Sequence, residues 1–173
     1  SDASIVVLQN EIPHEANLSI AKFCQENQVK VLYNPAPARE TDIEMIPFCD
    51  FITPNEHECS ELFPDKKLEE IIKIYPNKMI VTLGVEGSIY YDGTAVQKIP
   101  AIKAEVVDTT GAGDTFNGAF AYAISKGKEM NVALSFATIA SHLSVQRFGA
   151  QGGMPSLKEI KEHSGYEEIW DFK

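Results

Sequence analysis

Short apolar runs alternate with longer amphipathic segments through the first half of the chain. Continuous apolar stretches at residues 4–8 and 29–33 predict strands, and the first reads as a strand buried on both faces. Residues 15–28 carry apolar positions at helical spacing. The alternation continues with predicted strands at 50–53 and 79–83 and predicted helices at 55–63 and 68–74. This order predicts parallel strands joined by helical crossovers, and hence a layered α/β sheet.

The second half of the chain predicts a hairpin followed by helices. Asp92-Gly93 separates strand-like runs at 88–91 and 95–99, which is a strong hairpin pattern. Residues 111–125 and 130–145 predict two long helices. Ser156 and Glu159 have capping-box spacing, which predicts a last helix that extends to His163. No repeat or linker interrupts the 173 residues, so we expect one domain or part of a larger one.

Polar turns follow the predicted strands. In open α/β sheets, ligands bind beyond the carboxyl ends of the strands. We therefore expect the functional groups in five turns, which lie at Asn10-Glu11, Asn34, 55–58, 82–84 and 109–114.

The turn within VDTTGAGDTFNG, residues 107–118, carries the most specific chemistry. Small residues let backbone amides crowd around a ligand, and the start of a helix adds positive potential, so this turn suits a phosphate. Asp114 places a carboxylate beside that anion site, as needed to orient a hydroxyl for attack on a phosphoryl group. The alternative is structural: Asp108 as a turn residue and Asp114 as a helix N-cap.

The composition excludes some classes of binding partner. The net charge of −10 and pI near 4.8 argue against nucleic acid but leave room for a single nucleotide. The sequence has no transmembrane-length apolar run and no secretory signal pattern, so we expect no membrane partner. Cys24, Cys49 and Cys59 form no CxxC pair, which favours a reducing, cytoplasmic compartment with the thiols in or near the core.

Five segments follow one another in a fixed order along the chain. They are NPAPAR at 34–39, TPNEHE at 53–58, TLGVEG at 82–87, VDTTGAGDTFNG at 107–118 and RFGAQ at 147–151. Together they resemble the ribokinase-like, or PfkB-type, carbohydrate kinases. The resemblance extends from Leu8 to Pro155, and the segment 34–39 resembles ribokinases in particular. The resemblance implies a three-layer ribokinase-like fold with a mostly parallel central sheet flanked by helices. Residues 1–173 would be the nucleotide-binding and catalytic-base part of a kinase domain that lacks its amino-terminal strands and β lid.

The resemblance also implies roles for individual residues. Asp114 would be the catalytic base, and the amides of Gly111, Ala112 and Gly113 would hold the transferring phosphoryl group. Glu11 would bind the sugar.

Other positions would bind the nucleotide and its metal ion. Glu58 would help to hold Mg²⁺ through water. Contacts to ATP would come from Asn55, Thr82, Gly84 and Thr138, although family members often carry Asn or His where Thr138 stands. From the spacing alone, Asn55 and Glu58 also fit a helix capping box.

A monovalent-cation site, K⁺ in ribokinases, is implied as well. Its ligands would come from Asp108, Thr110, Ser144, Arg147, Gly149 and Gly153. Family members often have a serine where this chain has Gly153.

These residues predict ATP-dependent phosphorylation of a sugar hydroxyl, with ribose favoured over fructose, a nucleoside or another sugar. The alternative is a catalytically silent nucleotide-binding or assembly fragment. Because the sugar-gripping part of the family pattern is not found, we expect the isolated chain to turn over no sugar appreciably. We also expect an unpaired sheet edge, through which two copies could pair as a homodimer.

Overall fold

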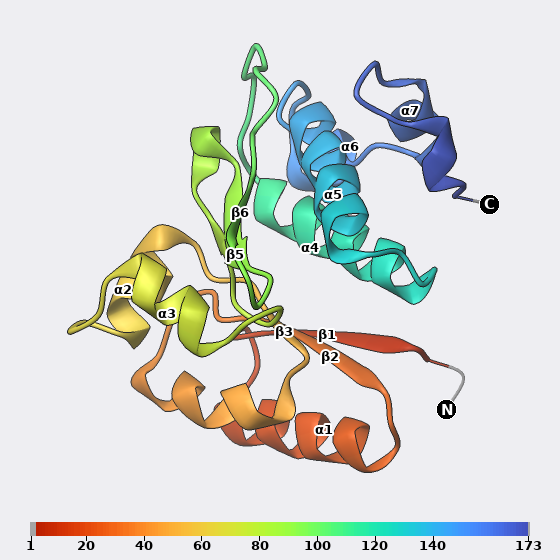
Figure 1. Ribbon diagram of the computed structural model, residues 1–173. Coiled ribbons are helices and arrows are strands. Elements are labelled where there is room, and N and C mark those ends of the chain that lie inside the picture. Colours follow the sequence, from red (N-terminus) through yellow and green to blue (C-terminus); the bar gives the residue numbers. More distant parts are fainter. Residues whose placement is uncertain (1–2, 173) are drawn as a thin grey trace. The chain divides into compact units, whose positions relative to one another are not determined.

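The computed structural model describes residues 3–172, whose contacts divide into two compact units. The amino-terminal unit extends to Gly84 and includes Ser88–Lys98, whereas the carboxyl-terminal unit comprises Val85–Gly87 and the chain from Ile99 onward. The first unit holds the sheet and the second is helical (Figure 1).

The sheet confirms the predicted alternation of strands and helices. Its strands are β1 (Ile5–Gln9), β2 (Lys30–Asn34), β3 (Phe51–Ile52), β4 (Ile80–Thr82), β5 (Ser88–Tyr91) and β6 (Val96–Ile99). β1, β2 and β3 are neighbouring parallel strands, and a parallel bridge between Ile52 and Met79 links β3 to the start of β4. β5 pairs antiparallel with β4, and β6 follows it as the hairpin partner. The fold is therefore α/β with a mostly parallel sheet.

Helices and short 3-10 turns connect these strands. They are α1 (His14–Glu26), η1 (Glu40–Phe48), α2 (Glu56–Leu62), α3 (Leu68–Ile74) and η2 (Gly84–Glu86). α1 lies along β1 and β2 and packs against η1 (Figure 1). The sequence pattern missed η1, because this segment follows a 3-10 path, contains Pro47 and lacks the period of an α-helix.

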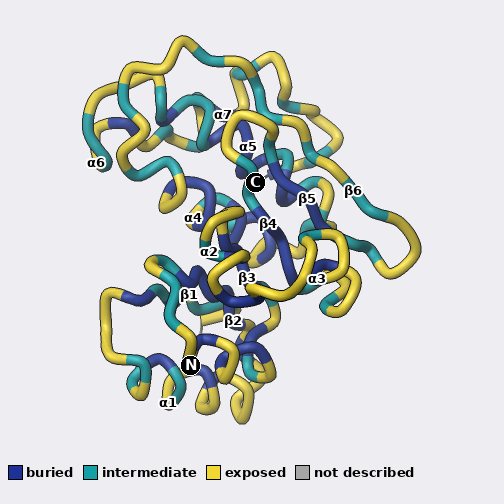
Figure 2. Tube along the Cα trace, turned by 90° about the vertical axis from the view of Figure 1, so that its left-hand side faces the viewer, coloured by how far each residue is buried: buried dark blue, intermediate teal, exposed yellow. Residues whose placement is uncertain are grey.

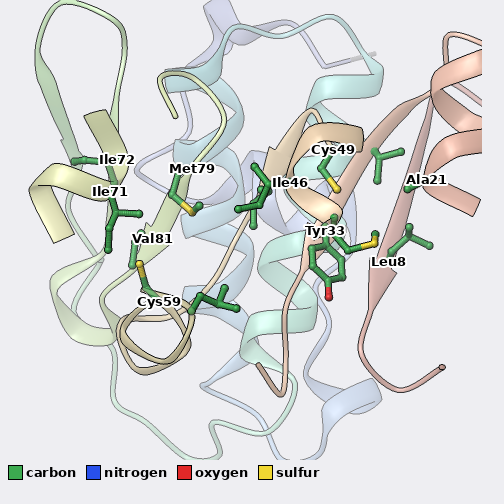
Figure 3. Close-up of a cluster of buried hydrophobic side chains, with 14 of the residues drawn as sticks. Leu8, Ala21, Tyr33, Ile46, Cys49, Cys59, Ile71, Ile72, Met79 and Val81 are labelled. Atoms are coloured by element: carbon green, nitrogen blue, oxygen red, sulfur yellow. The ribbon is translucent and has the colours of Figure 1, made fainter. Parts of the chain in front are cut away.

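The core of the amino-terminal unit lies between these helices and the sheet. Buried side chains from both layers meet there, among them Leu8, Ala21, Tyr33, Ile46, Cys49, Cys59, Ile71, Ile72, Met79 and Val81 (Figure 3). β4 and β5 are almost wholly buried, whereas β6 is more open (Figure 2). The three cysteines are buried and unpaired, as expected for core thiols.

The expectation that the first strand is buried on both faces is wrong. Leu8 is buried and Val6 packs against the core, but Val7 on the other face is 42% exposed. β1 stands at the end of the strand order, and among the described residues no further strand pairs with its outer edge. A continuous apolar run does not distinguish this position from a central one, because the sequence does not reveal what covers each face of the strand.

The carboxyl-terminal unit is built on two long helices that pack side by side (Figure 1). Its elements are α4 (Ala112–Ser125), α5 (Met130–Ser144), α6 (Ala150–Gly153), α7 (Leu157–Glu162) and η3 (Glu168–Trp170). The chain returns after η3 and inserts Phe172 against Phe136, with ring centroids 4.2 Å apart. α6 was not predicted, because a four-residue turn with two glycines lacks any helical period.

Both predicted capping boxes are present. The Asn55 side chain accepts a hydrogen bond from the Glu58 amide, and the Ser156 hydroxyl accepts one from the Glu159 amide. In each case the glutamate carboxylate accepts a hydrogen bond from the amide of the capping residue. These interactions join residues three positions apart, which is why the sequence revealed them.

Candidate functional site

The amino terminus of α4 is where the glycine-rich turn becomes a helix. Gly111 is the N-cap, in a left-handed conformation with φ of +77°. Ala112 and Gly113 are the first two helical residues, and Asp114 is the third. Asp114 is therefore not the N-cap, which corrects the structural alternative. Its exposed carboxylate stands in the first turn, beside amides that a helix leaves without internal acceptors.

Packing from two later elements fixes this turn. A Cβ placed on Gly111 would lie 2.9 Å from the Ala150 Cβ and 3.0 Å from its Cα, so only glycine fits against α6. The Ser141 hydroxyl of α5 donates to the Ala112 carbonyl over 3.3 Å. The turn is thus held in one shape by contacts distant in sequence.

Asp108 ties the approach to α4 to the segment that follows α5. One carboxylate oxygen accepts the Thr110 amide and the other accepts the Gly149 amide, each over 2.9 Å. A hydrogen bond from the Thr110 side chain and these two amide bonds stabilise the ionised form, and together they hold the pKa of Asp108 below its ordinary value. The Val107 and Asp108 amides both donate to the Val145 carbonyl, which anchors the same region. Asp108 is thus a turn residue, as the structural alternative proposed, and also a link between two segments.

The residues predicted for a monovalent cation lie close together in this unit. Gly153 packs so tightly on Ser144 that a Cβ would be 2.7 Å from the Ser144 carbonyl oxygen. The Gly153 amide donates to the Gly149 carbonyl over 2.8 Å. With Asp108 bonded to Thr110 and Gly149, five of the six predicted positions are linked by direct contacts.

Arg147, the sixth position, connects to this group through its backbone. Its amide donates to the Ser144 carbonyl over 3.4 Å. Its side chain points elsewhere, to an ion pair with Glu159 at the start of α7. That pair and the Ser156 amide lower the pKa of Glu159 to about 2. Only the Arg147 backbone remains as a candidate for cation binding.

Thr138 lies within α5 and is buried. Its hydroxyl donates to the Leu134 carbonyl one turn earlier, over 2.8 Å. The hydroxyl is thus occupied inside its own helix. A nucleotide contact from Thr138 stays a prediction, and it would involve the methyl group more readily than the hydroxyl.

In the amino-terminal unit, Asn55 and Glu58 stand at the start of α2. Asn55 caps the helix and a parallel bridge joins it to Thr82, at the carboxyl end of β4. Half-burial of Glu58 raises the pKa of its carboxyl, more than the bond from the Asn55 amide lowers it. A carboxylate held in this way is partly desolvated and favours a nearby cation.

Gly84 follows β4 with φ of +56° and is exposed, and nothing lies within 4 Å of where its Cβ would be. Glycine is thus favoured there by backbone conformation and not by packing. The structure brings together Asn55, Glu58 and Thr82, with Gly84 two residues beyond.

Glu11 lies in the turn after β1 and is exposed. The preceding residue, Asn10, belongs to a polar network that was not predicted from the sequence. The network joins Asn10 to the buried Asn17, Tyr33 and Asp42 and to the half-buried Arg39. The segment NPAPAR matched a family pattern, but no sequence signal showed that Arg39 or Asp42 bonds to Asn10.

Among residues 3–172, no group of three or more His, Cys, Asp or Glu side chains is placed to hold a metal ion. Nor does that part of the chain contain a helix with the length and apolar character needed to span a membrane.

Comparison with known proteins identifies the family. The sequence matches the pfkB family of carbohydrate kinases over residues 2–157. It is 66% identical to the ribokinase of Lactococcus lactis over 160 residues, which cover 92% of this chain and 53% of the relative. It is 46% identical to the ribokinase of Bacillus subtilis over 158 residues, covering 91% of this chain and 54% of the relative.

Solved structures of ribokinases also resemble this chain. A ribokinase of Arabidopsis thaliana complexed with ribose and ATP superposes with a TM-score of 0.82 at 34% identity, covering 99% of this chain and 57% of the other. Ribokinase from Thermotoga maritima gives a TM-score of 0.80 at 37% identity, covering 91% and 55%. The chain thus spans about half the length of the curated relatives that it matches.

Proposed function

The chain belongs to the pfkB family of carbohydrate kinases, and on this premise we propose that the protein it forms part of transfers a phosphoryl group from ATP to a sugar hydroxyl. The observation that carries the proposal is the start of α4, where Asp114 occupies the third helical position next to the Gly111–Gly113 turn. A helix start supplies amides and positive potential for an anion, and the carboxylate supplies a base at the same place.

In this proposal Asp114 accepts the proton of the attacking sugar hydroxyl. The amides of the turn stabilise the charge on the transferring phosphoryl group, which is the larger part of catalysis in such reactions. The close packing of Gly111 against Ala150 supports this role, because amides that are held in place before the reaction need not rearrange during it.

The nucleotide would be held by Asn55, Thr82, Gly84 and Thr138. Glu58 would face Mg²⁺ through water, and its partly desolvated carboxyl fits a cation with few protein ligands. When bound, the ion would neutralise charge on the phosphates.

Asp108 and the contacting backbone segments at Thr110, Ser144, Arg147, Gly149 and Gly153 would hold K⁺. Carboxylate and carbonyl oxygens are the donors that hard cations prefer. Gly153 packs closely against the Ser144 carbonyl and has no side-chain oxygen. The proposed ligands in this segment are therefore backbone oxygens. The ion would stabilise the segment that Asp108 already links to the α4 turn.

Ribose is the substrate that we propose. The Lactococcus lactis and Bacillus subtilis relatives are ribokinases, and the Arabidopsis thaliana ribokinase is complexed with ribose and ATP. In this scheme Glu11 binds the sugar. A nucleoside remains the second candidate, because the structure of a Methanocaldococcus jannaschii nucleoside kinase matches with a TM-score of 0.78 at 26% identity.

The test uses the natural polypeptide that carries this chain, with ribose, fructose and a nucleoside as acceptors and ADP release as the readout. Wild type should prefer ribose. Asp114→Asn should lower kcat by roughly a hundredfold or more, as loss of a general base does, and leave ATP affinity unchanged. Near-intact turnover by Asp114→Asn, measured beside an active wild type, would contradict the assignment of the base.

A second candidate function is a catalytically silent nucleotide-binding or assembly fragment, and the chain's coverage of about half its relatives favours it for the isolated 173 residues. Purified alone, this polypeptide should release ADP no faster with ribose than without it. Robust ribose-dependent turnover would rule out the silent fragment. Sizing of the same sample tests whether two copies pair through the β1 edge.

A further inference from the structure

The turn that carries Glu11 is held from both sides by one side chain. The Arg39 guanidinium donates through one terminal nitrogen to the Asn10 carbonyl and through the other to the Ile12 carbonyl, the latter over 3.3 Å. Asn10 and Ile12 flank Glu11 directly. Arg39 therefore spans the exposed residue without touching its carboxylate in any described contact.

Arg39 is itself fixed in place by a buried carboxylate. Its backbone amide donates to the Asp42 Oδ2 over 2.8 Å, and the same oxygen accepts the Asn10 side-chain amide over 2.7 Å. Asp42 is 1% exposed. Both ends of the bridge, Arg39 and Asn10, thus share one buried anchor.

Asn10 completes the connection between the two loops. It is 2% exposed, and its Nδ2 also donates to the Pro37 carbonyl over 2.7 Å. Its Oδ1 accepts the Tyr33 hydroxyl over 2.7 Å, and its backbone amide donates to the Ala36 carbonyl over 3.3 Å. The polar atoms of Asn10 are used on every side, so the residue before Glu11 has little freedom.

From this geometry we propose that Arg39 is a positioning residue for the sugar: it fixes the backbone on both sides of Glu11, so that the carboxylate is presented in one orientation. The proposal rests on the proposed function, which assigns the sugar contact to Glu11. A guanidinium places donors on two separate terminal nitrogens in a fixed plane, so it can reach two carbonyls at once, whereas a lysine ammonium has its three donors on one nitrogen at the end of a flexible chain. The role therefore belongs to arginine and not to positive charge in general.

The first test measures the turn itself in the 173-residue chain. Hydrogen exchange of backbone amides over residues 9–12 should quicken in Arg39→Ala and in Arg39→Lys relative to wild type. Lys78→Ala is the matched control, because Lys78 also donates to a backbone carbonyl in the same unit, that of Ile46 over 3.1 Å, and lies outside the Glu11 turn. It should leave exchange at 9–12 unchanged. Unchanged exchange in Arg39→Ala would overturn the proposal whatever the protein's activity.

The second test measures sugar use in the natural polypeptide. Arg39→Ala should raise KM for ribose roughly tenfold or more, since small misplacements of a substrate contact have large effects, and leave KM for ATP unchanged. Arg39→Lys should not restore the ribose KM, and Lys78→Ala should match wild type. A merely structural role would affect both substrates, or would be rescued by lysine.

A double-mutant cycle decides whether Arg39 acts through Glu11. If it does, Glu11→Gln should raise the ribose KM markedly in wild type and little in the Arg39→Ala background, because coupled residues are not additive. Full additivity in an active enzyme would overturn the proposal. A wild type that phosphorylates no sugar would refute the proposed function instead. The exchange result would then still decide whether Arg39 fixes the backbone on both sides of Glu11.

Discussion

Substituting alanine for Gly111 should destabilise the carboxyl-terminal unit through two separate effects, one on the backbone conformation and one on packing. The residue has φ of +77°, and a side chain in the left-handed region costs roughly 1–2 kcal/mol. The new Cβ would also lie 2.9 Å from the Cβ of Ala150 and 3.0 Å from its Cα, and crowding of that kind costs roughly 1–3 kcal/mol. Together these give a loss of about 2–5 kcal/mol in the free energy of unfolding.

The assay is urea denaturation followed by tryptophan fluorescence. Trp170 is the single tryptophan of the sequence and lies in the carboxyl-terminal unit, against Tyr166 with ring centroids 5.3 Å apart. Its signal therefore reports the unfolding of the unit that contains Gly111.

Two other glycines of the same segment serve as matched controls. Gly113 and Gly118 lie in α4, and nothing lies within 4 Å of where their Cβ atoms would be. Alanine at either position should be neutral or stabilise the helix by up to about 1 kcal/mol. If Gly111→Ala is as stable as Gly113→Ala, the packing of the turn against α6 does not constrain it, and the reasoning is refuted.

Three further predictions concern the rest of the molecule. Phe172→Ala should lower the free energy of unfolding by about 3 kcal/mol or more in the same urea assay, because the ring is 1% exposed; a loss under about 1 kcal/mol would show that the tail is not docked. Tyr33→Phe should cost about 1–2 kcal/mol by thermal or urea unfolding, since Asn10 loses a buried donor, and no change would mean that this bond is dispensable. The pKa of Glu159 is lowered to about 2 from an ordinary 4.5, so its support of α7 should be complete above pH 4.5 and disappear as the pH falls through about 2. A side-chain NMR titration checks this, and a midpoint near 4.5 in wild type would contradict it. In Arg147→Ala, which removes the ion pair and keeps the Ser156 bonds, the midpoint should rise above that of wild type.

Some of the candidate site was readable from the sequence because its signals are local. The spacing of Asn55 and Glu58 predicted a capping box, and the structure contains it. The glycine-rich turn before a helix was also predicted. The helix, predicted over 111–125, begins at Ala112, so Asp114 lies in the first turn and is not the N-cap of the structural alternative. A shift of this size is expected, because helix ends depend on caps and packing that periodicity does not report.

The contacts that shape the same residues were not predictable. Arg39 bonds to a carbonyl 29 residues earlier, and Asp108 accepts an amide 41 residues later. Nothing in the spacing of these residues indicates their partners, because such pairs meet only after the sheet and the helices have packed. The failure at β1 has the same origin, since the exposure of Val7 depends on what covers the strand.

The sequence by itself determined the order of strands and helices, the capped helix starts and the family to which the chain belongs. These features follow from the spacing of apolar residues, from hydrogen bonds between residues three positions apart, and from short motifs whose amides and carboxylates lie within one turn. Only the tertiary structure decided that Gly111 and Gly153 must be glycines, that Asp108 joins two segments and that Arg39 holds the turn of Glu11. The physical reason is that a close packing contact or a bridging hydrogen bond involves two segments far apart in the sequence. These segments meet only when the chain folds.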